Sequence, residues 1–402
     1  MDVNKLELLQ KFALDQLEKV IMPFWRAYTP DNINNGFYGQ VNLDLTPDFN
    51  AQKGLILNAR LLWTFSSVYR KFHNRQDIEL AIRAYTYLKE YFYDSEYSGY
   101  YWSLNPDGTP AETKKQIYAE AFVIYGFSEY YRINPDVNIL QDAIDLFQLI
   151  EEHSFDTLDN GYIEACDRTW NELADLRLSA KDMNEKKSMN THLHILEAYA
   201  NLYRVWPDKI LAEKLENLIF VFKDHIVSKQ DHHLNLFFDE HWNSRSNLIS
   251  YGHDIEASWL MYEAALVLGK KNVTDEIRGT CLKVADAALK GFRFPGALIY
   301  EDDRDGKHKD HLVEWWPQAE GIVGCLNAYA LNGDEALVEK AAMFTKFIEN
   351  YVVDHENGEW FFRVDLEGNP VRSYEKAGFW KCPYHNARAC LEILQRVEEL
   401  TG

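Results

Sequence analysis

The side chains of this chain that are best suited to proton transfer are three histidines, His194, His253 and His385. His253 and Glu256 lie three residues apart, which places them on one face of a helix and lets them touch. A carboxylate that accepts a hydrogen bond from an imidazole fixes its tautomer and raises its basicity. The pair therefore predicts a general base, although a buried capping pair without a catalytic role has the same spacing.

His385 follows the segment Trp380-Lys381-Cys382-Pro383-Tyr384. Because proline suits the first turn of a helix, Pro383 predicts that His385 lies about one turn inside a helix. A lone histidine in such a place is more often a satisfied core residue. The second histidine motif, at His253, favours a shared site instead.

Metal binding is the first alternative for these histidines. His192 and His194 point about 200° apart around a helix, so they cannot bind one ion. His194, His253 and Glu256 could bind one together, but no His-Glu-x-x-His pattern supports such a site. We therefore predict no metal.

Polar and aromatic residues recur at or near the starts of alternate predicted helices. They are Arg60, Tyr118, Asn190 with His194, His253 with Glu256, Trp316 with Glu320, and Trp380 with His385. If these helices form an inner ring, the side chains converge in one funnel, which is the usual setting of a ligand site. Two alternatives to a role in the site stay open: Arg60 could pair with an acidic neighbour, and Tyr118 could serve only in packing. Of the adjacent Trp315 and Trp316, one should face the core and the other the funnel, where an indole suits the C–H face of a sugar.

Paired carboxylates would instead indicate glycoside hydrolysis. Asp182, Glu256 and Glu320 are the candidates, but the predicted site is richer in histidine than that mechanism needs. A sugar-binding protein without catalysis is a third class that the residues leave open.

The elements that hold these residues follow from a repeat, a glycine followed by aromatic or apolar residues. Its copies begin at Gly36, Gly99, Gly161, Gly296 and Gly358, with spacings of 63, 62, 135 and 62 residues. The double spacing predicts one unmarked unit, at the glycine-free stretch 234–238. Six units of about 62 residues predict a closed array of identical supersecondary units.

Between these segments the apolar residues follow a helical period, with two helices in each unit. The predicted helices are 4–24, 53–72, 77–93, 116–132, 137–152, 187–204, 208–227, 253–268, 273–290, 315–331, 335–352 and 382–399. Short turns alternate with long connections that carry the aromatic segments, so every second helix starts at the same end of the molecule. The sequence predicts an all-α toroid of two helix layers, with short β-hairpins on one rim, as a single domain over residues 1–402.

Composition limits the partners and the location. The 402 residues are 47% hydrophobic and carry a formal net charge of −21, which repels nucleic-acid phosphates and anionic lipid. Five scattered cysteines without a Cys-x-x-Cys pair predict neither a disulfide framework nor a zinc ribbon. Residues 1–5 lead into an amphipathic helix without an apolar signal core, and no stretch is long enough to span a bilayer. We expect a cytoplasmic protein, without nucleic-acid or membrane partners.

At these residues the chain resembles the N-acylglucosamine 2-epimerase superfamily, nearly from end to end. The resemblance is carried by Gly36-Phe37-Tyr38-Gly39, by 188–194 with 196–199, by 250–260, by 315–320 and by 380–386. The last segment is similar to the branch of the family that acts on cellobiose. The resemblance implies an (α/α)6 barrel, in agreement with the repeat, and we expect a monomer or a weak homodimer.

The resemblance also implies an activity, namely epimerisation at C2 of the reducing-end glucose of a β-1,4 disaccharide such as cellobiose or lactose, with no cofactor. It implies that His253 and His385 are the acid/base residues and that His194 stabilises the oxyanion of a cis-enediolate. The residues implied to hold the sugar are Arg60, Tyr118, Asp182, Asn190, Glu256, Trp316, Glu320 and Trp380. Near-neutral pKa values would let each histidine act as base in one direction and acid in the other. A monosaccharide 2-epimerase or an aldose-ketose isomerase of the same superfamily is the nearest alternative.

Overall fold

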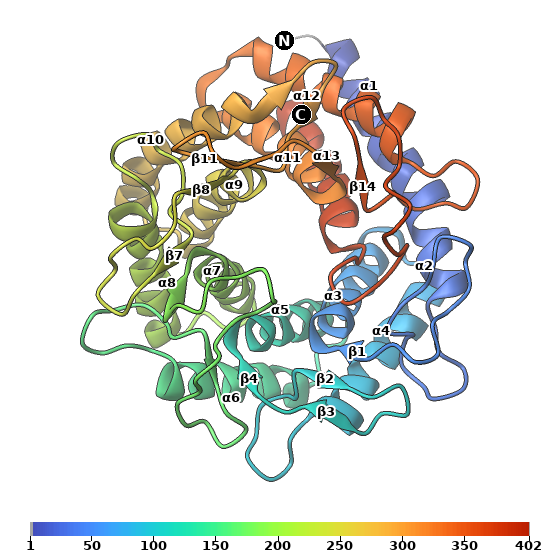
Figure 1. Cartoon of the computed structure of the whole chain (residues 1–402), viewed down its shortest axis with the longest axis vertical. Helices are drawn as coiled ribbons and strands as arrows, with labels where there is room; N and C mark the ends of the chain where they lie inside the picture. Colours follow the sequence, from blue (N-terminus) through green and yellow to red (C-terminus); the bar gives the residue numbers. More distant parts are fainter. Residues whose placement is uncertain (1–2, 402) are drawn as a thin grey trace.

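A computed structural model describes residues 3–401 and shows two concentric rings of helices (Figure 1). Residues 1, 2 and 402 of the predicted domain lie outside the described residues. Residues 1 and 2 also belong to the start of the chain, for which the sequence predicts no signal peptide. The inner helices are α3 (Leu55–Phe72), α5 (Ile117–Ile133), α7 (Met189–Tyr203), α9 (Tyr251–Leu268), α11 (Trp315–Asn332) and α13 (Tyr384–Thr401). The outer helices are α1 (Val3–Asp15) with its continuation α2 (Met22–Tyr28), α4 (Arg75–Tyr87), α6 (Val137–His153), α8 (Lys209–Val221), α10 (Lys271–Ala288) and α12 (Glu335–Phe347).

The inner ring is closed. Each inner helix packs against its two inner neighbours, and α13 meets α3. Short turns join each inner helix from α3 to α11 to the outer helix that covers it. The final helix, α13, packs against α1 instead, so the two terminal helices complete the sixth pair. Because the sixth pair joins the two ends of the described chain, we infer one domain.

Polar side chains in the short turns cap the N-termini of four outer helices. Asn74, Asp136, Asp208 and Asp334 each accept a backbone N–H two residues further on and so cap α4, α6, α8 and α12. The inner helices are buried on nearly every side, apart from residues 391–401 of α13, whereas the outer helices bury one face. All twelve predicted helices are present, with shifted ends. One shift corrects a prediction: α13 begins at Tyr384, so His385 lies in its first turn.

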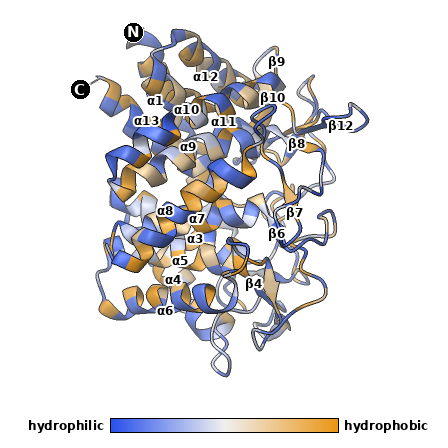
Figure 2. Ribbon diagram, turned by 90° about the vertical axis from the view of Figure 1, so that its left-hand side faces the viewer, coloured by the Kyte–Doolittle hydropathy of each residue, from blue (hydrophilic) through white to orange (hydrophobic). Residues whose placement is uncertain are grey.

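Short strands lie together on one side of the barrel (Figure 2). They are β1 (Lys53–Gly54), β2 (Ser103–Leu104), β3 (Pro110–Glu112), β4 (Lys115–Gln116), β5 (Ala165–Cys166), β6 (Lys187–Ser188), β7 (Phe237–Phe238), β8 (Leu248–Ser250), β9 (Phe292–Arg293), β10 (Ala297–Leu298), β11 (Glu301–Asp303), β12 (Lys309–Asp310), β13 (Val313–Glu314) and β14 (Arg363–Val364). The strand before an inner helix pairs antiparallel with a strand of the next unit, as β4 does with β5 and β6 with β7. These pairs join adjacent units around the predicted rim.

The repeat marks a tight turn on this rim. Five antiparallel bridges join residues seven apart: Pro30–Phe37, Tyr93–Tyr100, Phe155–Tyr162, Val227–Leu234 and Val353–Trp360. Gly36, Gly99 and Gly161 precede three of these bridge residues with φ of +61°, +69° and +85°. The bridge at Leu234 confirms the unmarked unit, in which His232, with φ of +64°, supplies the left-handed residue of the turn.

All five cysteines are free and buried. Within residues 3–401, each helix is too short or too polar to cross a bilayer.

Candidate active site

The predicted site residues lie on the strand-bearing side, where the inner helices begin. Each inner helix contributes at least one: Arg60 from α3, Tyr118 from α5, Asn190 and His194 from α7, His253 and Glu256 from α9, Trp316 and Glu320 from α11, and His385 from α13. Trp380 precedes α13, and Asp182 lies in the connection between β5 and β6. Most of these side chains are buried; Asn190, His253, Trp380 and Asp182 are partly exposed. The parallel starts of the inner helices therefore bring residues from six distant segments to one end of the ring.

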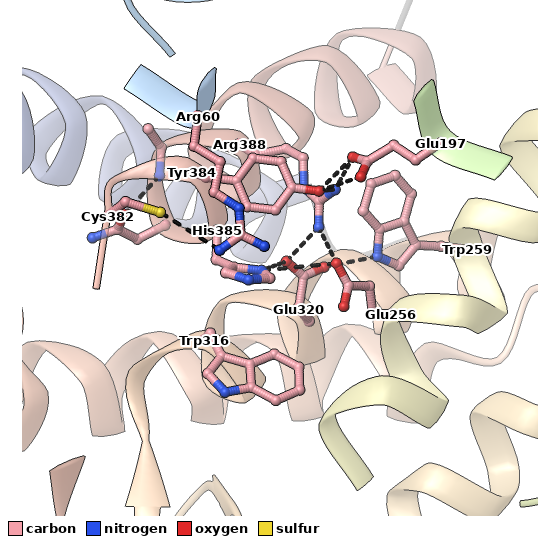
Figure 3. Close-up of polar contacts among 12 residues, drawn as sticks. Arg60, Glu197, Glu256, Trp259, Trp316, Glu320, Cys382, Tyr384, His385 and Arg388 are labelled. Atoms are coloured by element: carbon pink, nitrogen blue, oxygen red, sulfur yellow. Dashed lines mark hydrogen bonds and ion pairs between the residues drawn. The ribbon is translucent and has the colours of Figure 1, made fainter. Parts of the chain in front are cut away.

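His385 is supported by a carboxylate. Its Nδ1 lies 2.7 Å from Glu320 Oε1, and Glu320 also accepts Trp259 Nε1–H at 3.0 Å (Figure 3). Arg388, one turn further along α13, donates to the same Glu320 oxygen at 2.7 Å. The carboxylate holds the hydrogen of His385 on Nδ1, which leaves the lone pair on Nε2.

The predicted pairing of His253 with Glu256 is wrong. His253 Nδ1 lies 2.8 Å from Ser250 Oγ. Glu256 accepts from Arg388 Nη2 at 2.5 Å, and its Oε1 lies 3.8 Å from His385 Nδ1. The spacing does place both residues on α9, but the guanidinium from α13 binds the carboxylate. Burial and the charge of Glu320 raise the pKa of Glu256, whereas the charge of Arg388 lowers it.

Trp316 contacts two of the histidines. Its ring centroid is 4.7 Å from that of His253 and 5.3 Å from that of His385. Its Nε1–H donates to Glu314 at 2.8 Å, which fixes the ring. Trp315 packs on Phe362 at 4.6 Å and lies 6.4 Å from His385, between ring centroids, so the two adjacent tryptophans have different neighbours.

Arg60 is a buried cation with neutral partners. Its Nη2–H donates to Tyr118 Oη at 2.7 Å, and its guanidinium lies 4.2 Å from the Phe122 ring centroid. Among residues 3–401, no carboxylate comes within ion-pair distance of Arg60, so the alternative of an acidic neighbour is wrong. Four enclosed polar atoms of the site lack a hydrogen-bond partner in the described chain: Arg60 Nε, Asn190 Oδ1, Glu256 Oε2 and Arg388 Nε. These atoms are available to a polar ligand.

The three histidines are neutral at pH 7. Burial lowers the pKa of His194 to about 4 and that of His253 to about 3. Burial, Arg60 and Arg388 together hold the pKa of His385 well below its usual range. The expected near-neutral pKa values are therefore wrong. In each imidazole Nδ1 has a partner, whereas Nε2 has none within residues 3–401, so each Nε2 is open to a substrate.

Comparison with known proteins places this geometry in a family. The sequence model of N-acylglucosamine 2-epimerase (GlcNAc 2-epimerase) matches residues 36–389. The chain belongs to this family. A cellobiose 2-epimerase from Bacteroides fragilis is 48% identical over 390 residues, which cover 96% of this chain and 99% of that protein.

Solved structures of the same family agree. The cellobiose 2-epimerase of Spirochaeta thermophila has a TM-score of 0.93 and 37% identity, covering 99% of each chain. That of Bacillus thermoamylovorans has a TM-score of 0.91 and 39% identity, covering 97% of this chain and 99% of the other. The chain is thus a sugar 2-epimerase with the (α/α)6 barrel fold of its relatives, which confirms the predicted fold class and family.

Sequence reasoning missed three residues of this epimerase, Glu197, Tyr384 and Arg388. Glu197 accepts from His194 Nδ1 at 2.9 Å and from Tyr384 Oη at 2.5 Å. Arg388 donates to Glu197 as well as to Glu256 and Glu320. The spacing rule applied to His253 would have found the pair of His194 and Glu197, which are also three residues apart. The available signal for Arg388 was a charged residue set between Ala387 and Ala389-Cys390 in a predicted inner helix.

The donor set closest to a metal site differs from the predicted alternative. Within residues 3–401, donor atoms of Glu256, Glu320 and His385 lie within 4.8 Å of one another. The alternative of His194, His253 and Glu256 does not form such a group among these residues. Arg388 Nη2 already binds both carboxylates of the observed group, so a guanidinium compensates their charge.

Asp182 and Trp380 lie on the side of the site that carries the loops. Asp182 accepts from the backbone N–H and the hydroxyl of Ser179 at 2.8 and 2.9 Å, and burial raises its pKa. These contacts stay within its own loop and do not reach a histidine. Trp380 lies 6.3 Å from Tyr118 and 6.1 Å from Trp102, between ring centroids.

Proposed function

We propose that this epimerase interconverts glucose and mannose at the reducing end of cellobiose-type β-1,4 disaccharides by proton transfer at C2. One observation carries the proposal: three neutral imidazoles, with free Nε2 atoms, share an end of the barrel with the uncompensated cation of Arg60. Neutral imidazoles remove protons, and the cation stabilises the anion that results. The cellobiose 2-epimerases named among the relatives support this choice of substrate.

The chemistry has three stages. Ring opening moves the proton of O1 to O5 and creates an aldehyde, which acidifies the hydrogen on C2. A base then takes this proton, and the electrons of the C2–H bond form the C1–C2 double bond and place a negative charge on O1. Protonation of the cis-enediolate on its other face gives the epimer. We assign His253 and His385 as the two acid/base residues, because both contact the ring of Trp316 yet come from different helices.

Arg60 is suited to the developing charge. A buried guanidinium without a carboxylate partner has its full charge available for an oxyanion, and a low-dielectric setting strengthens that interaction. Asn190 Oδ1 and Glu256 Oε2, enclosed and unpartnered, would accept or exchange hydrogen bonds with sugar hydroxyls. Trp316 and Trp380 would pack on the two sugar rings, Tyr118 would hold Arg60, and Asp182 would bind sugar from the loop.

Glycoside hydrolysis fits the carboxylates less well. Oxygens of Glu256 and Glu320 lie within 4.8 Å of each other and share one arginine, whereas a hydrolase needs separations of about 5 to 9.5 Å across the scissile bond. Both carboxylates face an imidazole or a guanidinium and leave no pair free to flank a glycosidic oxygen.

The test is an incubation of cellobiose with the enzyme in deuterated water. We expect glucosyl-mannose that carries deuterium at C2. Epimer without solvent deuterium would contradict proton transfer, and release of free glucose would indicate hydrolysis. Parallel incubations with mannose and N-acetylglucosamine compare the monosaccharide activities, and faster turnover of either would move the assignment to another branch of the family.

A further inference from the structure

Glu197 is a carboxylate beside His194 that accepts hydrogen bonds from several buried donors. It lies on α7, one turn after His194, and is 4% exposed. Its Oε2 is 2.9 Å from His194 Nδ1, and Tyr384 Oη donates to it at 2.5 Å. Arg388 Nη1 donates to Oε1 (Figure 3). Three donors from two helices therefore converge on one carboxylate.

The proton state of His194 follows from these contacts. Burial opposes ionisation of Glu197, but the Arg388 charge and the hydrogen bonds from His194 and Tyr384 lower its pKa to about 2. An ionised carboxylate can only accept, so the hydrogen of the neutral imidazole lies on Nδ1. Nε2 then carries the lone pair and has no partner within residues 3–401. The rings of Tyr118 and Phe122, at 5.0 and 4.7 Å, hold the imidazole in place.

We propose that Glu197 is a positioning residue that, with Tyr384 and Arg388, holds His194 in the tautomer whose Nε2 accepts the hydrogen of a sugar hydroxyl. The proposal rests on the function proposed above and refines the role of His194. A bare lone pair repels an oxyanion, so His194 cannot stabilise the enediolate before it takes a proton. In the ring-opening stage the O1–H bond breaks and an N–H bond forms at Nε2, and the same proton then passes to O5 as the C1–O5 bond breaks. The transient imidazolium is paired with Glu197. Nε2 is neutral again before C2 is deprotonated, and the charge of the enediolate is left to Arg60.

Glu197→Gln tests this tautomer directly. Arg388 can only donate and binds Oε1, so the amide oxygen takes that place and the amide NH2 takes the place of Oε2, facing His194 Nδ1. The Tyr384 hydroxyl can donate or accept and so fits either group. Nδ1 must then accept, which moves the imidazole hydrogen to Nε2. Nitrogen-15 NMR of histidine-labelled enzyme without substrate should show an unprotonated Nε2 for His194 in the wild type and a protonated one in the variant, with His194→Asn used to assign the signal. Glu197→Asp, which keeps an acceptor, should retain the wild-type tautomer.

Turnover of cellobiose provides the second measurement. Glu197→Gln should lower kcat by roughly a hundredfold or more, within the range for loss of a correctly held acid/base group. The matched control is Glu120→Gln on α5, which replaces an equally buried carboxyl that accepts the backbone N–H of Tyr100 at 2.9 Å. The control should keep kcat within about threefold of wild type, since Glu120 contacts no histidine of the site.

Two results would overturn the proposal. A protonated Nε2 of His194 in the wild type would do so without any variant, which covers the case in which Glu197→Gln fails to fold. A folded Glu197→Gln enzyme with wild-type kcat would do so as well. Failure of the wild type to epimerise cellobiose would instead refute the proposed function, while the NMR measurement still decides the tautomer.

Discussion

Arg388 Nη2 lies 2.7 Å from Glu320 Oε1, the carboxylate oxygen that also meets His385. Arg388 is one of two buried arginines of the site, and Arg60 is the other. Arg388 binds three carboxylates, whereas Arg60 bonds to a tyrosine hydroxyl and a thiol. The two cations should therefore respond to mutation in opposite ways.

Arg388→Met should destabilise the protein by about 3–5 kcal/mol, because it leaves three buried carboxylates without their cation. Arg60→Met should leave the unfolding midpoint unchanged or raise it, because its partners are neutral, and yet lower kcat by about 10²–10³-fold. Chemical denaturation and cellobiose turnover measure the two effects. Equal loss of stability in both variants would contradict this division.

His385→Asn and His253→Asn should each lower turnover by at least about a hundredfold while the circular dichroism spectrum and the unfolding midpoint stay near wild type. The reason is that each imidazole offers a free Nε2 that asparagine cannot replace as a base. Deuterium incorporation at C2 of unreacted cellobiose separates the two roles. A variant with wild-type turnover would remove that histidine from the mechanism.

Acidification should lower the free energy of unfolding, because it acts on the buried neutral histidines, which include His192 outside the site. His192 Nε2 accepts the Tyr162 N–H at 2.9 Å, and burial lowers the pKa of His192 to about 4. As pH falls from 6.5 to 4, the unfolded chain binds this proton and the folded chain resists it, so stability is lost over this window. One such group contributes about 3 kcal/mol.

The measurement compares urea midpoints of wild type and His192→Asn between pH 7 and pH 4.5. The buried carboxyls of Glu120 and Glu164, with pKa values raised by burial to about 7, gain stability as pH falls, so only the difference between the two proteins is informative. The variant should lose less stability than wild type on acidification, and the exposed His308→Asn should behave like wild type. Parallel pH curves for all three proteins would contradict the assignment.

Gly252, directly before His253, leaves no room for a side chain. An added Cβ would lie 2.5 Å from Trp316 Cη2 and 2.8 Å from Pro317 Cγ. Gly252→Ala should displace the ring of Trp316 and lower kcat by about tenfold to a hundredfold. The control, Gly279→Ala on α10, meets no atom within 4 Å, so activity should be unchanged and stability should rise by about 1 kcal/mol.

Trp380 should distinguish a disaccharide from a monosaccharide. It is partly exposed and precedes the helix that carries His385, which suits packing on the second sugar ring. Trp380→Ala should raise KM for cellobiose by roughly tenfold, the effect expected from losing one aromatic contact with a sugar ring. It should change KM for mannose little. Equal increases for both sugars would place this tryptophan against the reducing-end ring.

Much of the fold was predictable because it depends on local and periodic properties. The helical period of apolar residues and the repeat of about 62 residues predict twelve helices and a closed ring, and both are present. The turn at Leu234 confirms a unit that carries no glycine at its marker position. The cytoplasmic location and the monomer or weak homodimer stay predictions.

The sequence alone also predicted that the candidate site residues gather at one end of the barrel, since residues at the starts of alternate helices must meet there. It could not determine the partners of the histidines. His253 with Glu256 and His194 with Glu197 have the same spacing, but only the second pair forms. Arg388, 132 residues from Glu256 along the chain, binds that carboxylate and leaves His253 to Ser250. Spacing brings two side chains to one face of a helix, whereas the choice among charged partners, and the burial that lowers the histidine pKa values, depend on segments that meet only in the closed ring.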